Sequence, residues 1–149
     1  MAGGISFTWE NIQVVEDKLS AIASKMASAN TLAVTLAANI VKKNAQTGLA
    51  LRSHPRGTWT PSPPGDAPAL VTGALRRSIT VNMLSTGSIA RAEVGPTIIY
   101  GRIQELGGQT GRGHAVTLPA RPYMAPALEY SIPEMTEAVK SAWLTAFEV

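Results

Sequence analysis

The sequence predicts an α+β fold: a long N-terminal helical segment, a small antiparallel sheet of three to four strands, and a C-terminal amphipathic helix packed on the sheet. Apolar residues recur at helical spacing in residues 8–45 and 124–147. Between them, residues 78–95 alternate apolar and polar side chains around a Thr-Gly turn, which is typical of an antiparallel hairpin. A length of 149 residues suits one domain with its own core. We therefore expect a single domain (1–149) made of an N-terminal helical segment (1–47), a proline-rich arm or loop (48–68), and an α+β core with the C-terminal helix (69–149).

The N-terminal segment carries two apolar stripes, separated by the polar run 28–31. Because this run interrupts the pattern, we expect a bend or a break there. Either the helix folds back on itself or part of it packs on a neighbour, and we favour two helices, the second lying on the sheet. Asn44 and Gly48 are the expected stop. We interpret the first stripe as core rather than coiled coil, since its heptads do not run cleanly past about two repeats. The stripes are Ile12, Val15, Leu19, Ile22 and Met26, then Leu32, Leu36 and Ile40.

The arm is rich in proline, with five prolines in the 14 residues 55–68, which excludes a helix or a central strand. Trp59 lies inside it. An indole is costly to leave in water, so we expect Trp59 to dock on the same chain or on a neighbour. The alternative is a disordered loop with a solvent-exposed Trp59.

The rest of the chain alternates short elements before the last helix. A short helix is expected within 69–77, and a hairpin from strands 78–84 and 89–95. Further strands are expected at 115–118 and, as a fourth, at 97–100. An amphipathic segment, 99–106, is stopped by two glycines. The final helix, 124–147, has Pro126 in its first turn, and Pro133 either kinks it or starts a second half after Ser131 as N-cap.

The sequence offers no catalytic or cofactor motif, so we expect no enzyme, no cofactor and no metal. Cysteine is absent, and His54 and His114 lie in different loops without ligands at a metal-binding spacing. The glycine-rich run 107–113 lacks the ending of a phosphate-binding loop. Glu105 is expected to pair with Arg102 or Arg121, or to accept backbone N–H groups.

Charge is unevenly distributed along the chain. Residues 52–121 hold eight arginines against three acidic residues, whereas residues 122–149 hold four glutamates against one lysine. This asymmetry favours head-to-tail contact between copies, and simple scatter is the alternative. Aromatic residues are sparse near Arg76 and Arg77, so we expect no sequence-specific nucleic-acid binding and at most weak contact with phosphate by charge. No run of 18 apolar residues and no basic leader occur, so we expect no membrane span or signal peptide, and a protein made and used in a cytoplasm.

Three sequence segments follow one another along the chain: TGALRRSI (72–79), VGPTIIYGRIQELGG (94–108) and ARPYMAPAL (120–128). This order resembles the tailed-phage family of neck and tail-completion (head–tail joining) proteins usually called gp-ten-like. The match covers roughly residues 66–128, and Gly101 and Leu106 replace the commoner Ala and Phe. The matching positions are Gly73, Leu75, Val94, Gly95, Tyr100, Glu105, Gly107, Pro122, Tyr123 and Pro126.

The resemblance implies a structural virion protein of a long-tailed phage that forms a ring, with six copies expected, at the head–tail junction. Its implied partners are further copies of itself, the neighbouring connector or stopper proteins, and the tail-tube or tail-terminator protein. The alternatives are a tail-terminator ring that caps the tube and a non-structural prophage regulatory binding protein. Candidate subunit or partner contacts are Trp59, Arg76, Arg77, Arg102, Glu105, Arg112, His114 and Arg121.

Overall fold

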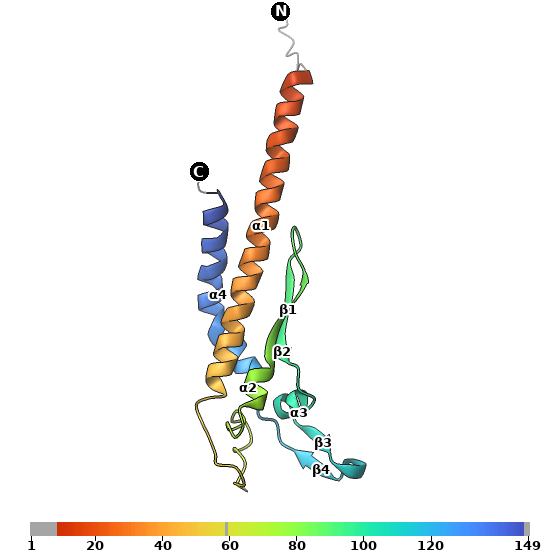
Figure 1. Cartoon of the computed structure of the whole chain (residues 1–149), viewed down its shortest axis with the longest axis vertical. Helices are drawn as coiled ribbons and strands as arrows, with labels where there is room; N and C mark the ends of the chain where they lie inside the picture. The colour runs from red at the N-terminus through yellow and green to blue at the C-terminus, as the bar shows by residue number, and fades with distance from the viewer. Residues whose placement is uncertain (1–8, 59, 148–149) are drawn as a thin grey trace, which may run out of the picture.

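The computed structural model describes residues 9–58 and 60–147 and confirms the α+β fold (Figure 1). Two helices lie side by side, a β-hairpin packs beside them, and a second, smaller hairpin projects at one end. The elements, in order, are α1 (Trp9–Gly48), α2 (Ala74–Ser78), β1 (Ile79–Ser85), β2 (Arg91–Pro96), α3 (Gly101–Leu106), β3 (Gly108–Thr110), the 3-10 turn η1 (Arg112–His114), β4 (Val116–Leu118) and α4 (Met124–Phe147).

The N-terminal segment is one continuous helix of 40 residues, so the predicted division into two helices is wrong. The polar run at 28–31 serves another purpose. The Thr31 hydroxyl donates a hydrogen bond to the carbonyl of Ala27 and accepts one from the N–H of Gly87 at 2.8 Å. The side-chain amide of Asn30 donates to the carbonyl of Ser88 at 3.0 Å. These polar side chains therefore hold the turn of the β1–β2 hairpin against α1 without breaking the helix. Gly48 ends the helix, as predicted.

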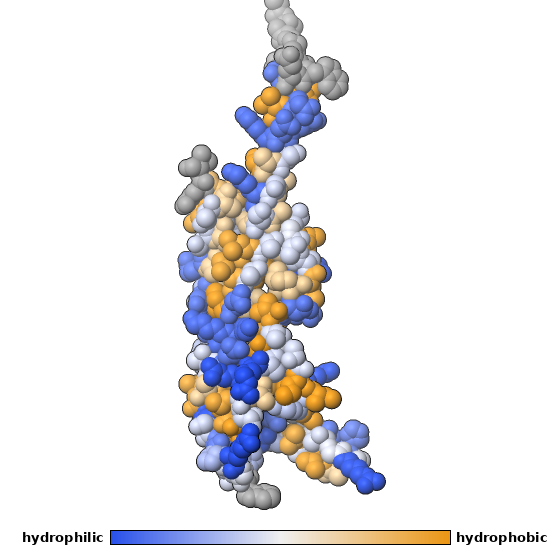
Figure 2. All heavy atoms as spheres, viewed as in Figure 1, coloured by the Kyte–Doolittle hydropathy of each residue, from blue (hydrophilic) through white to orange (hydrophobic). Residues whose placement is uncertain are grey.

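The face of α1 that packs inside the molecule is built mostly of alanine. Four of the five buried apolar residues described on α1 are alanines, and Ala45 has no exposed surface. Small side chains let α4 approach α1 closely, and contact between these two helices is the most extensive in the molecule. The expected core stripe Ile12–Met26 is instead exposed, and Leu32 and Leu36 are exposed as well. Figure 2 shows apolar surface spread along the whole length of the molecule.

The helix α4 is continuous from Met124 to Phe147, with Pro133 inside it. Ser131 is therefore not an N-cap, contrary to one of the two alternatives for this region. It is fully buried, donates to the carbonyl of Ala127 at 2.6 Å, and accepts the side-chain amide of Asn44 at 2.9 Å. This pair is a satisfied polar link between α1 and α4 in an otherwise apolar contact.

The predicted hairpin forms as an antiparallel pair of β1 and β2, with Val81 opposite Val94 and a bulge between Met83 and Ser85. The strand expected at 115–118 also forms, as β4. It pairs with β3 in a separate two-stranded sheet, so it does not extend the first one. Residues 97–100 form a turn leading into α3, and the expected fourth strand is not there. The first turns of α4 reach the start of β1 through Ile79, which places α4 on the strands as predicted.

The proline-rich segment folds back on its own chain. Leu70 and the stretch Arg52–His54 exchange backbone hydrogen bonds of 2.8 and 3.1 Å, and Arg52 forms an ion pair with Asp66. Gly65 donates its N–H to the carbonyl of Ala120 at 2.9 Å, just before α4. The described part of this segment is thus held by the subunit itself. The predicted docking of Trp59 concerns a residue outside the described part of the chain.

In the described ranges, no helix combines the length and the apolar character required to cross a bilayer.

Candidate functional site

The carboxylate of Glu105, on α3, holds the first turn of α4. Its Oε2 accepts the backbone N–H groups of Tyr123 at 2.7 Å and Met124 at 2.9 Å, and its Oε1 accepts that of Ala125 at 3.0 Å. The first N–H groups of a helix have no partner within the helix, and the helix dipole favours a negative charge beside them. Glu105 is therefore an N-terminal cap supplied from another element. Its predicted role as an acceptor of backbone N–H groups is confirmed.

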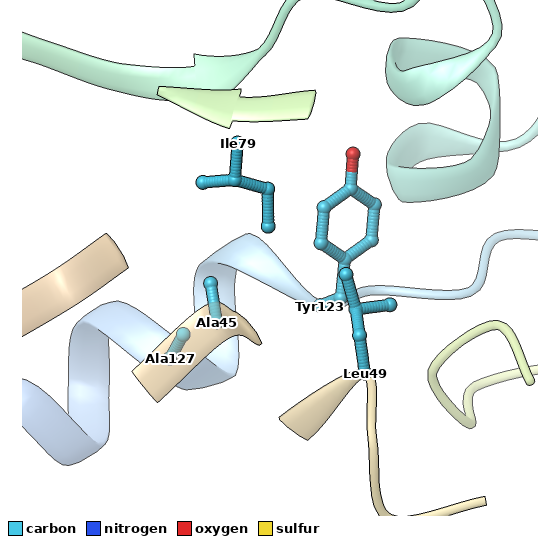
Figure 3. Close-up of a cluster of buried hydrophobic side chains, with 5 residues drawn as sticks. All are labelled: Ala45, Leu49, Ile79, Tyr123 and Ala127. Atoms are coloured by element: carbon cyan, nitrogen blue, oxygen red, sulfur yellow. The ribbon is translucent and has the colours of Figure 1, made fainter. Parts of the chain in front are cut away.

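Tyr123 lies beside this cap and ties α4 to α3. Its side chain is 3% exposed, and its hydroxyl donates to the carbonyl of Gly101 at 3.1 Å. Burial, followed by the nearby charges of Glu105 and Tyr100, raises the pKa of Tyr123 from 10.0 to about 12. Figure 3 shows its ring beside Ile79 and Leu49, where the end of α1, the start of β1 and the start of α4 meet. The phenol is thus a neutral, fixed strut at physiological pH.

Gly101 makes room for this contact. A Cβ added there would lie 2.4 Å from Cγ of Pro96 and 3.2 Å from the Tyr123 hydroxyl. Any side chain would have to displace the end of β2 or the phenol. Glycine at this position therefore has a steric basis, because the packing around Pro96 leaves no room for a Cβ.

Arg121 is buried and makes its contacts within the subunit. Its expected role as a partner contact is therefore wrong. It is only 7% exposed, its Nε donates to the carbonyl of Ser62 at 2.8 Å, and its backbone N–H donates to the carbonyl of Gln104 at 2.8 Å. It therefore fastens the proline-rich segment to the junction of α3 and α4. In the part of the chain that the structure describes, no ion pair joins Glu105 to Arg102 or Arg121.

Gly107 closes the base of the β3–β4 hairpin. It has a φ of 69°, and an added Cβ would lie 2.7 Å from the backbone nitrogen of Ala120 and 2.9 Å from the carbonyl oxygen of Leu118. The two ends of the hairpin approach each other at this point, which both the sterics and the left-handed backbone restrict to glycine.

The other residues of the family-like pattern surround the same junction. Leu75 and Val94 pack against the buried cluster, and Gly73 adopts a φ of 73° before α2. Tyr100 is exposed at the start of α3, whereas an added Cβ on Gly95 would meet nothing within 4 Å. Gly95 therefore has no steric requirement within the subunit.

Pro122 and Pro126 flank the start of α4 and line a pocket of about 490 Å³ beside the end of α1. Pro126 tolerates its place because the first helical turn has N–H groups without intrahelical partners, and Pro122 lies before the helix begins. With Glu105 and Tyr123, these residues form one structural junction, and its chemistry is that of positioning α4.

Arg76 and Arg77 lie at the end of α2, in an open depression of about 620 Å³ that we call the basic depression. His54 lines it as well, and no carboxylate does. Both arginine side chains are exposed, and the carbonyl of Arg76 accepts the side-chain amide of Gln46 at 3.2 Å. The depression is a place where an acidic surface from another molecule can bind.

The remaining basic candidates lie elsewhere. Arg102 is exposed on α3, and Arg112 and His114 are exposed on η1, at the tip of the projecting β3–β4 hairpin (Figure 1). His114 has a φ of 58°, a strained value for a residue other than glycine. The structure therefore does not bring the candidate contacts together at one site, and Trp59 stays outside the described residues.

The acidic part of the chain lies on the outside of α4. Glu129, Glu134 and Glu137 are exposed; Glu134 lies 3.7 Å from Lys43, and Glu137 lies 2.7 Å from Lys140. Within residues 9–58 and 60–147, no three acidic or histidine side chains are placed to share a metal ion. We call these three exposed glutamates the acidic face.

Sequence reasoning missed an apolar groove of about 670 Å³ between α1, the β1–β2 hairpin and the start of α4. Arg91 is the one charged residue along its described walls. Its walls include Val34, Ala37, Ala38, Val41, Leu84, Ala90, Ala92, Val94, Met124, Leu128 and Met135. The apolar character of these residues is evident from their side chains. The sequence pattern does not show which elements leave them uncovered.

No family model, curated protein or solved structure shows significant similarity to this chain. The resemblance to phage neck proteins therefore stays a prediction.

Proposed function

We propose that this chain is a structural virion protein that forms a ring at the head–tail junction of a long-tailed phage. The three ordered segments that resemble gp-ten-like proteins support the phage assignment. One structural observation carries the proposal of self-association: many large aliphatic side chains are exposed, including Leu19, Leu51 and Ile99, while most buried apolar positions described are alanines.

The total surface supports the same proposal. A compact protein of 15.7 kDa exposes about 7,300 Å², whereas this chain exposes 10553 Å². A stable interface removes roughly 800 Å² from each partner, so the excess is enough for two separate interfaces per copy. A ring needs two such surfaces, one facing each neighbour.

The two charged surfaces fit a head-to-tail arrangement. The basic depression on α2 and the acidic face on α4 lie on different elements of the subunit and carry opposite charge. A contact between unlike surfaces repeats around an axis and closes into a ring when the rotation permits it. The ring of six copies comes from the resemblance alone.

The proposed mechanism is interlocking. The ring sits between the connector or stopper proteins and the tail-tube or tail-terminator protein, and the projecting β3–β4 hairpin contacts a neighbour. DNA in the lumen touches the ring without sequence recognition, since basic side chains attract phosphate by charge alone. The protein is a component of the virion in this proposal, and it assembles in the host cytoplasm.

A charge swap tests the head-to-tail arrangement. The double variant Arg76→Glu, Arg77→Glu is expected to lower the oligomer mass and to abolish tail joining when it replaces the natural protein in the phage. Adding Glu129→Arg and Glu134→Arg is expected to restore assembly. The control, Lys25→Glu with Arg56→Glu, changes the net charge equally at exposed sites elsewhere. Unchanged oligomer mass and tail joining in the first variant would refute the arrangement.

A further inference from the structure

One apolar stripe runs along nearly all of α1, and only its second half is covered. The positions follow one another at spacings of three and four, which keeps them on one side of the helix. From Ala29 onward the stripe packs against α4 and the hairpin, or lines the apolar groove. Before that point it is exposed, and Leu19 shows 60% of its surface. We call the exposed part, Ile12, Val15, Leu19, Ile22 and Met26, the open stripe.

The subunit cannot cover the open stripe by itself. No glycine or proline interrupts α1 before Gly48, and the helix is continuous from residue 9, so this half cannot fold back. Figure 1 shows that α1 extends past both the hairpin and the end of α4. Burying the open stripe therefore requires another molecule.

The apolar groove fits the open stripe as a partner. Its walls combine small residues, such as Ala37, Ala90 and Ala92, with the longer Leu128 and Met135, which leaves an elongated apolar hollow beside α1. Along α1 the groove spans residues 34–41, about 10 Å at 1.5 Å per residue. Two helical turns fit this length. The segment from Leu19 through Ile22 to Met26 also spans about two turns, so its length matches that of the groove.

Charge supports the same pairing. Arg91, at the groove, has no carboxylate partner among the described ion pairs. Glu16 lies at the edge of the open stripe, three residues before Leu19, and is exposed. A helix seated through Leu19 would bring an acidic side chain to the rim of the groove, where Arg91 lies.

We propose that the open stripe of one copy packs into the apolar groove of the next copy, head to tail around the ring. This inference rests on the proposed self-association and adds the segment and the surface that perform it. The contact is heterologous, because donor and acceptor are different surfaces of the same chain. The part of α1 from Ala29 onward already packs within the subunit. The proposed contact would continue this apolar packing from one copy to the next.

Crosslinking tests the pairing, and the full chain has no natural cysteine to interfere. Two single variants, Leu19→Cys and Leu128→Cys, are mixed and treated with a short bismaleimide linker. The expected result is a crosslinked dimer in the mixture and in neither variant alone. The matched control is Ser20→Cys, which is adjacent in sequence, exposed, and turned well away from the open stripe; mixed with Leu128→Cys it should give no dimer.

The outcomes separate the possibilities. A dimer from Leu19→Cys alone would overturn the proposal in favour of two α1 helices pairing with each other. No crosslink in the mixture, when native mass spectrometry shows that the protein is oligomeric, would overturn the inference and leave self-association standing. A monomeric mass under the same conditions would overturn both. In a chain carrying both cysteines, a ladder beyond the dimer supports head-to-tail packing, whereas a ladder that stops at the dimer contradicts it.

Discussion

The carboxylate of Glu105 accepts the backbone N–H of Tyr123 at 2.7 Å, which joins α3 to the first turn of α4. The projecting β3–β4 hairpin is the chain between these two points, so this contact also closes the hairpin at its base. The orientation of α4, and with it the acidic face, rests on this cap together with the Tyr123–Gly101 hydrogen bond and the packing of α4 against α1.

Replacing Glu105 by alanine should destabilise the subunit. Three backbone N–H groups lose their acceptor, and loss of a helix cap costs about 0.5–2 kcal/mol. Urea denaturation measures the change. The control is Glu137→Ala, whose exposed pair with Lys140 should contribute less than about 0.5 kcal/mol. Equal stability of the Glu105 variant and the natural protein would show that the cap does not hold α4.

Replacing Gly101 by alanine should cost about 1–3 kcal/mol, because the new methyl group overlaps Pro96. Gly48→Ala is the matched control. It also lies in a helix, and an added Cβ meets nothing within 4 Å, so this change should be neutral or stabilising by about 0.4–1 kcal/mol. Thermal denaturation compares the two. If both variants behave alike, the close approach of Pro96 to Gly101 is not a constraint in solution.

The pKa of Tyr123 predicts a loss of stability in alkali. The folded-state pKa of about 12 exceeds the ordinary 10.0, so the unfolded state releases its proton first as the pH rises. This contribution is complete below pH 10 and disappears as the pH approaches 12. The difference between the two pKa values corresponds to about 2.7 kcal/mol of stability.

Denaturation of Tyr123→Phe measures this contribution. The variant should lose about 1 kcal/mol below pH 10, because the hydrogen bond to Gly101 is missing, and it should decline less steeply above that pH. Parallel pH profiles of the variant and the natural protein would contradict the argument.

Changes in the open stripe should weaken assembly of the oligomer without lowering the stability of the single subunit. The double variant Leu19→Asp, Ile22→Asp removes apolar groups that are exposed within the subunit, so its free energy of unfolding as a monomer should change by no more than about 0.5 kcal/mol. Its oligomer mass should fall. Ala33→Asp is the contrasting variant, since it places a charge at a buried position and should unfold the subunit. Unfolding of the Leu19, Ile22 variant would show that the stripe belongs to the core.

Much of the local structure could be predicted, because local patterns determine it. Alternation gave β1 and β2, helical periodicity gave α4 with the bounds Met124–Phe147, and the glycines after Leu106 marked the end of α3. Acceptance of backbone N–H groups by Glu105 was one of two expected roles, and Ala125 is among its donors.

The rest depends on contacts between distant parts of the chain. Hydropathy ranks Leu32 above Ala33, yet Ala33 is buried, because the close approach of α4 selects the side with small residues. The polar run ending at Thr31 suggested a break, and only the position of Gly87 in space explains its presence. Asn44 and Ser131 are 87 residues apart, and neither carries a local signal of their contact.

Native mass spectrometry of the purified protein across a concentration series is the most direct test of self-association. A closed ring, with six copies expected, should become populated as the protein concentration rises. A strictly monomeric mass at every concentration would contradict self-association, and with it the proposal that the exposed aliphatic surface exists to join copies of this chain.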